Sequence, residues 1–194
     1  TSVLDGLDRQ RLRRHMEREP LYRFWLAMMQ TWQDLLWRYT GACVDRQLDR
    51  LVADCRPSPG DRGSLHLDPD LELPRYQSAV NNHCLPGGYH AETRPDDVRQ
   101  GAIYAHSATL YLLGQTGVHH DYRGQTLISH IRARFPDLQP REIVDLGCLV
   151  GASTAAYPAH FPQAHIAAVD TSAPGLRFGH GLAESRGLAI DFHQ

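Results

Sequence analysis

The segment EIVDLGCLVG, residues 142–151, constrains the fold of this chain more strongly than any other part of the sequence. A hydrophobic run ends here in Asp145, and Gly147 and Gly151 follow four positions apart. A strand that ends in such a turn and leads into a helix places backbone N–H groups against a ligand at the carboxyl end of a sheet. We expect glycine at both positions because a Cβ atom would fill the ligand's space. The segment therefore predicts a ligand-binding turn; the alternative is a turn that binds nothing.

A second acidic residue, Asp170, ends the hydrophobic run HIAAVD twenty-five positions after Asp145. A carboxylate at the end of the next strand is placed to accept hydrogen bonds from both hydroxyls of a ribose, although Asp170 could also be a turn acid or a helix cap. The dinucleotide pattern G-x-G-x-x-G needs glycines where this chain has Leu149 and Ala152, which argues against NAD(P). Asp145 suits a ligand with a positive amino group. Together the two motifs predict a nucleoside site.

The C-terminal region alternates between helical and strand patterns. Its pattern predicts an α/β fold with parallel strand pairing, because the crossovers are too long for hairpins. The expected elements are helices over 124–135, 152–160 and from Ser172 to Gly187, and strands over 141–146, 165–170 and 188–192.

The N-terminal region is predicted to be helical. Apolar side chains at steps of three and four indicate an amphipathic helix over 21–39, whose stripe of Trp25, Met28, Met29 and Trp32 we expect to be core, or alternatively the wall of an acceptor pocket. Further helices are expected over about 3–18, 44–55 and 96–113, and a loop or linker over 56–76. We therefore predict a helical domain over 1–118 and a Rossmann-like cofactor-binding domain over 119–194.

The segments VDLGCLVGAST and FPQAHIAAVDTSAPGLRFGHGLAESRGLAIDF, with the spacing between them, resemble the first half of a class I S-adenosylmethionine-dependent methyltransferase. The resemblance covers about residues 119–194. It implies that the glycine turn lies beside the methionine moiety of S-adenosyl-L-methionine, that Asp170 holds the ribose, and that the adjoining residues flank the adenosine. The family usually has glycine at the position of Leu149. The cofactor-binding residues so implied are Asp145, Gly147, Cys148, Gly151, Asp170, Thr171 and Ser172.

The resemblance implies an enzyme that transfers a methyl group to a small-molecule acceptor. No general base is identified by a motif; His83, Tyr89 and His90, around a PGGY turn, are the candidates, and Tyr104 and His106 are possible ligand contacts. We expect Cys148 to be a packed loop residue, because no His or Asn partner is placed to activate it. The alternatives are a non-catalytic binding or scaffold module with a degenerate nucleoside site, and a nucleotide-dependent oxidoreductase.

The family sheet has seven strands, and the sequence reaches only about the third. We therefore expect the chain to be a fragment, or another chain or a second copy to complete the sheet, because a cut beside the first strand leaves an unpaired edge.

Charge and composition exclude several other functions. The net charge of −2 argues against a nucleic-acid or anionic-membrane partner recruited by bulk charge. All twenty basic residues are arginine, which excludes a P-loop lysine or Schiff-base chemistry within these 194 residues. Four cysteines without a C-x-x-C pair favour reduced thiols and a cytoplasmic location. The twelve histidines show no metal-binding spacing, so no metal is predicted.

Overall fold

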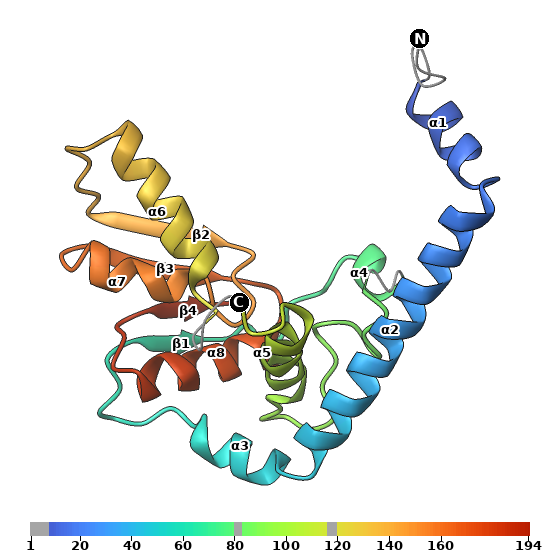
Figure 1. Ribbon diagram of the computed structural model, residues 1–194. Coiled ribbons are helices and arrows are strands. Elements are labelled where there is room, and N and C mark those ends of the chain that lie inside the picture. The colour runs from blue at the N-terminus through green and yellow to red at the C-terminus, as the bar shows by residue number, and fades with distance from the viewer. Residues whose placement is uncertain (1–7, 80–82, 116–119) are drawn as a thin grey trace.

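A computed structural model describes residues 8–79, 83–115 and 120–194 (Figure 1). Along the chain its helices and strands are α1 (Arg9–Met16), α2 (Pro20–Asp45), α3 (Leu48–Asp54), β1 (Ser64–His66), α4 (Arg75–Ala79), α5 (Arg99–Tyr111), α6 (Tyr122–Arg134), β2 (Glu142–Leu146), the 3-10 helix η1 (Thr154–Ala156), α7 (Tyr157–His160), β3 (His165–Val169), α8 (Ala173–Ser185) and β4 (Asp191–His193).

The four strands form one parallel sheet in the order β1-β4-β3-β2. The predicted α/β class with parallel pairing is confirmed, and so is the alternation of helices and strands from α6 onward. The predicted cap of α8 is also confirmed, because the Ser172 hydroxyl accepts a hydrogen bond from the Gly175 N–H at 3.0 Å. The expected strand over 188–192 begins later, at Asp191. Helix α8 contacts β1 and β4, α5 packs on α8, and α2 packs on α5, so the helical packing extends outward from the sheet.

Strand β1 lies inside the segment predicted to be a loop or linker, so that prediction is wrong at Ser64–His66. The Ser64 hydroxyl donates to the Asp191 carboxylate at 2.6 Å, across 127 positions of sequence. Gly63 is required beside it, because a Cβ atom there would lie 2.0 Å from the backbone oxygen of Ile190. This part of the N-terminal region therefore supplies one edge strand of the C-terminal sheet.

The tryptophan and methionine stripe of α2 is not core, which corrects the prediction from its helical spacing. Trp25 is 49% exposed and Trp32 is 39% exposed, whereas the buried residues of this helix lie in its last third and include Trp37 and Val44. The reason is visible in Figure 1, where the first half of α2 and all of α1 extend away from the sheet and its helices. Residues 44–55 divide between the end of α2 and a new helix, α3. Of the helix expected over 3–18, residues 1–7 lie outside the described residues.

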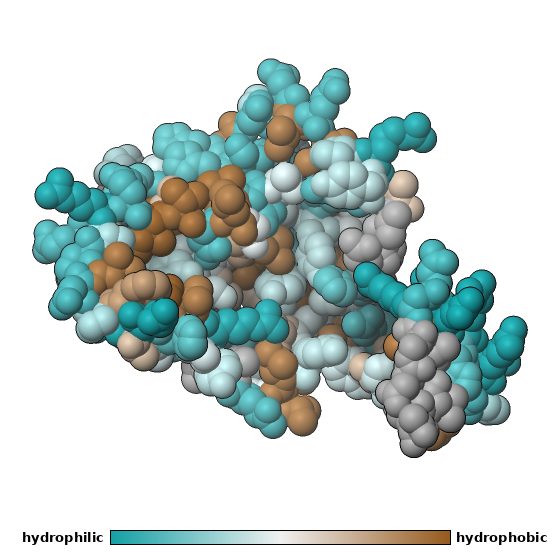
Figure 2. Space-filling model, turned by 90° about the horizontal axis from the view of Figure 1, so that it is seen from above, coloured by the Kyte–Doolittle hydropathy of each residue, from teal (hydrophilic) through white to brown (hydrophobic). Residues whose placement is uncertain are grey.

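Strand β2 is an edge of the sheet, as expected for a first strand without its second neighbour. Val144 is 60% exposed and Leu146 is 77% exposed, although both belong to the hydrophobic run that predicted the strand. Figure 2, which views the molecule from above Figure 1, shows hydrophobic side chains gathered on part of that face. None of the described helices combines the length and apolarity that a bilayer crossing requires.

His165 joins three neighbouring strands at the end of the sheet opposite the glycine turn. Its ring nitrogens lie 2.6 Å from the carboxylate of Asp191 on β4 and 3.0 Å from that of Glu142 on β2. Hydrogen bonds to Asp191 and then to Glu142 raise the pKa of His165 above its ordinary value. The protonated ring is therefore the form that the folded sheet favours.

We expect stability to fall as pH rises through the raised pKa of His165. A raised folded-state pKa gives a contribution that is complete below the ordinary histidine value of about 6.5 and is lost above the folded value. The His165→Gln variant should lose this pH dependence, which urea unfolding midpoints at pH 6 and pH 8.5 would measure. His130→Gln, on the exposed face of α6, is the matched control; an equal loss in both variants would contradict the assignment to His165.

Candidate functional site

The turn after β2 has an unusual backbone that depends on its glycines. Gly147, Leu149 and Gly151 all have positive φ, at 81°, 51° and 66°. The N–H groups of Gly147 and Cys148 both donate to the carbonyl of Val169, at 2.8 and 3.1 Å, so the turn is fixed to the end of β3. The sequence forms this turn because glycine adopts positive φ without the steric cost that a Cβ atom imposes.

The two glycines have different neighbours. A Cβ atom built on Gly147 would meet nothing within 4 Å, whereas one built on Gly151 would lie 3.0 Å from the ring of Phe192. Gly147 therefore opens onto free space, as predicted for a ligand-facing position. Gly151 is instead needed for close packing on β4, and it does not line the cavity described below.

Asp170 faces the turn. Its two carboxylate oxygens accept hydrogen bonds from the backbone N–H of Leu149 and from that of Ser172, each at 2.8 Å. An ionised carboxylate has about four lone-pair sites, so each oxygen retains capacity for a hydroxyl donor. Ser172 in turn donates from its hydroxyl to the carbonyl of Tyr89, 2.5 Å away. Through these hydrogen bonds, Asp170 and Ser172 connect the end of β3 to the glycine turn after β2 and to the PGGY turn.

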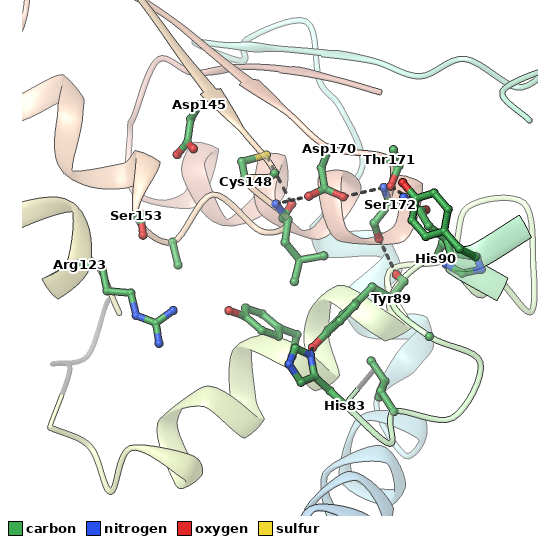
Figure 3. Close-up of a pocket in the computed structure, with 18 residues that line it drawn as sticks. His83, Tyr89, His90, Arg123, Asp145, Cys148, Ser153, Asp170, Thr171 and Ser172 are labelled. Atoms are coloured by element: carbon green, nitrogen blue, oxygen red, sulfur yellow. Dashed lines mark hydrogen bonds between the residues drawn. The ribbon is translucent and has the colours of Figure 1, made fainter. Parts of the chain in front are cut away.

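A cavity of about 500 Å³ lies at the carboxyl ends of β2 and β3 (Figure 3). Its size falls within the roughly 300–1,000 Å³ typical of small-molecule sites. Six of the seven predicted cofactor-binding residues line it, namely Asp145, Gly147, Cys148, Asp170, Thr171 and Ser172. The structure therefore brings together residues that are separated by up to 27 positions, with Gly151 as the exception.

Asp145 lies at the opposite end of the cavity from Thr171 and Ser172 (Figure 3). One of its carboxylate oxygens accepts from the Thr154 hydroxyl at 2.6 Å, which orients the group. With Asp170 it makes the lining of this cavity acidic, and an acidic lining attracts a cationic ligand. The arrangement suits a positively charged group that is carried on a sugar.

Candidate bases also reach the cavity. His83, Tyr89, His90 and Tyr104 line it, whereas His106 packs against Phe178 and lines neither this cavity nor its neighbour. His83 Nδ1 and the Tyr89 hydroxyl are 2.5 Å apart. Burial, followed by the neighbouring Tyr104, raises the pKa of Tyr89 to about 12. Tyr89 therefore stays protonated at neutral pH, and its role is to donate or accept hydrogen bonds as a phenol.

Cys148 is unsuited to nucleophilic chemistry, as expected. Burial, and after it the carboxylates of Asp170 and Asp145, raises the pKa of its thiol, so the reactive thiolate is disfavoured. No group of histidine, cysteine and acidic residues with metal-binding geometry occurs in the described part of the chain. His119 lies outside that part, and His120 lies 2.5 Å from the Thr109 hydroxyl through its Nε2.

Leu149 occupies the position where the resemblance implies glycine. It lines the cavity, but its side chain also packs toward α8, since its Cδ1 atom would be 2.8 Å from a Cβ atom built on Gly175. It belongs partly to the core cluster of α2, α5 and α8. The leucine therefore narrows the cavity without filling it.

Sequence patterns missed several lining residues. Tyr76 and Gln77 come from α4, which begins at the end of the predicted linker, and Gln77 accepts from the Thr171 hydroxyl at 3.2 Å. Arg123 comes from the first turn of α6, and Ser153 follows the glycine turn. Ser153 could have been found from its closeness to the motif. No local sequence pattern predicts that α4 or Arg123 lines the cavity, because long-range packing brings them there.

Comparison with family models, with curated proteins and with solved structures finds no match for this chain. The methyltransferase resemblance therefore stays a prediction that is carried by the two motifs.

Proposed function

We propose that this protein binds S-adenosyl-L-methionine in the cavity at the ends of β2 and β3 and transfers its methyl group to a small-molecule acceptor, in the cytoplasm. One observation carries the proposal: the Asp170 carboxylate is hydrogen-bonded to the glycine turn, and both line a cavity onto which Gly147 opens. A carboxylate turned away from the turn, or a side chain filling the cavity beside them, would have removed the basis for a nucleoside site.

The residues fit the parts of this cofactor. Asp170 would accept from the ribose hydroxyls, and Thr171 and Ser172 would lie beside the adenosine. Gly147 would admit the methionine moiety, and Asp145 would attract its amino group and the positive sulfonium.

The methyl transfer would mainly require that the donor and the acceptor be positioned correctly. S-adenosyl-L-methionine supplies a methyl group on a positively charged sulfur, which is already an activated leaving group. The protein's contribution would be to hold donor and acceptor in line at contact distance and to exclude water. A base is needed only for an acceptor that must lose a proton; His83, which lies beside the Tyr89 hydroxyl, is the candidate we propose for that step.

Calorimetric titration with S-adenosylhomocysteine tests the proposal. We expect saturable binding to one site per chain and no binding of NAD⁺ under the same conditions, because Leu149 and Ala152 replace the glycines that a pyrophosphate needs. Absence of heat with millimolar S-adenosylhomocysteine would overturn the proposal and favour the scaffold alternative. Binding of NAD⁺ alone would favour the oxidoreductase.

A further inference from the structure

A second cavity, of about 320 Å³, adjoins the first. The two share the lining residues His83, Tyr89, Tyr104, Arg123, Ala152 and Ser153. The rest of its wall comes mainly from α2, α5, α8 and the glycine turn, and it is mostly apolar and aromatic. The residues that give it this character are Leu36, Trp37, Tyr111, Leu112, Val150 and Leu182.

The two cavities differ in charge. Asp145 and Asp170 line the first cavity only, and no carboxylate lines the second among the described residues. Arg123 lines both, and Figure 3 shows its guanidinium directed into the hollow between Ser153 and His83. No hydrogen bond or ion pair links Arg123 to another residue in the described part of the chain. The positively charged guanidinium of Arg123 therefore lies where the two cavities meet.

Ser107 gives a second indication of a ligand. It is fully buried on α5 and lines the second cavity, and its hydroxyl has no hydrogen-bond partner among the described residues. A buried hydroxyl without a hydrogen-bond partner destabilises the fold. An acceptor with a polar substituent in addition to the carboxylate proposed below would satisfy it.

We propose that the second cavity binds the methyl acceptor and that this acceptor is a small aromatic carboxylate. The inference rests on the proposed function. The aromatic ring would pack between Trp37 and the tyrosines of the cavity wall, where offset and edge contacts favour another ring. The carboxylate would pair with Arg123, whose planar guanidinium matches a carboxylate in two parallel hydrogen bonds. This orientation directs the carboxylate toward the donor cavity. One of its oxygens would form the new bond to the methyl carbon as the bond from that carbon to the sulfonium sulfur breaks, which gives a methyl ester and S-adenosylhomocysteine.

The test uses acids and amides of the same shape as probes. Benzoate with benzamide, and 3-phenylpropionate with 3-phenylpropionamide, are titrated by calorimetry into the protein saturated with S-adenosylhomocysteine. We expect at least one acid to bind about 3- to 10-fold more tightly than its amide, because Arg123 is exposed and solvent screens part of its attraction to a carboxylate. Arg123→Met, titrated at S-adenosylhomocysteine concentrations that saturate the variant, should abolish that preference.

Arg134→Met is the matched control, since Arg134 is an exposed arginine of the same helix that lies over Phe135 and lines neither cavity. It should bind acids and amides as the unaltered protein does. Equal binding of acids and amides, or binding of neither, would overturn the inference. In both cases the proposed function would survive, whereas failure of S-adenosylhomocysteine to bind any variant would remove both.

Discussion

Asp170→Asn is expected to weaken the binding of S-adenosylhomocysteine by at least about 100-fold. Two ribose hydroxyls would donate to this carboxylate, and hydrogen bonds to a charged group contribute about 1.5–3 kcal/mol each. The amide also presents an N–H₂ group toward one of two backbone donors, Leu149 N–H or Ser172 N–H, that now donate to the carboxylate. Both effects act on the ligand site, and calorimetric titration measures them together.

Asp137→Asn is the control for charge, because Asp137 is exposed, follows α6 and lines neither cavity. It should bind S-adenosylhomocysteine normally. Urea unfolding of both variants separates a loss of affinity from a loss of the fold. A folded Asp170→Asn variant with unchanged affinity would show that this carboxylate does not hold the ligand.

The paired variants Gly147→Ala and Gly151→Ala should separate binding from stability. Gly147→Ala adds a methyl group in open space, so its cost to folding is about 1–2 kcal/mol for the left-handed backbone alone. That methyl group would nevertheless lie against the proposed cofactor, and we expect binding to fall by more than about 10-fold. Gly151→Ala adds the same strain and also forces a contact with Phe192, so we expect a loss of about 2–5 kcal/mol of unfolding free energy.

Urea unfolding and calorimetric titration of both variants measure this contrast. The result expected is a folded Gly147→Ala protein with weakened binding and a markedly destabilised Gly151→Ala protein. If Gly147→Ala binds S-adenosylhomocysteine normally, the open side of the turn is not the ligand site.

The C-terminal half of the fold could be predicted because its signals are local. Asp145 and Asp170 mark the ends of β2 and β3, Ser172 caps α8, and Gly187 ends it with φ at 67°. The six predicted residues that line the cavity follow directly from these strand ends, since the carboxyl ends of parallel strands meet at one edge of a sheet.

The rest depended on contacts that no window of sequence reveals. Strand β1 has three residues, and its partner β4 lies 127 positions away. The spacing of Trp25 and Trp32 correctly predicted a helix with an apolar face, but it could not show whether other elements cover that face. Trp32 contacts the ring of Tyr111 on α5 and is still 39% exposed, and Trp25 is 49% exposed. Arg123 reached the cavity only through the packing of α6, where a Cβ atom on the next residue, Gly124, would be 2.1 Å from the backbone oxygen of Ser153.

The position of β2 at the rim of the sheet has a thermodynamic consequence for the cavity. Asp145 belongs to β2, and the glycine turn follows this strand directly. Among the described residues, β2 has a hydrogen-bonded neighbour, β3, on one side only. Any polypeptide that pairs along the other flank would bring its own strand end beside Asp145. Occupancy of the cavity and pairing along that flank would then be coupled equilibria, and each would change the affinity of the other by the same factor.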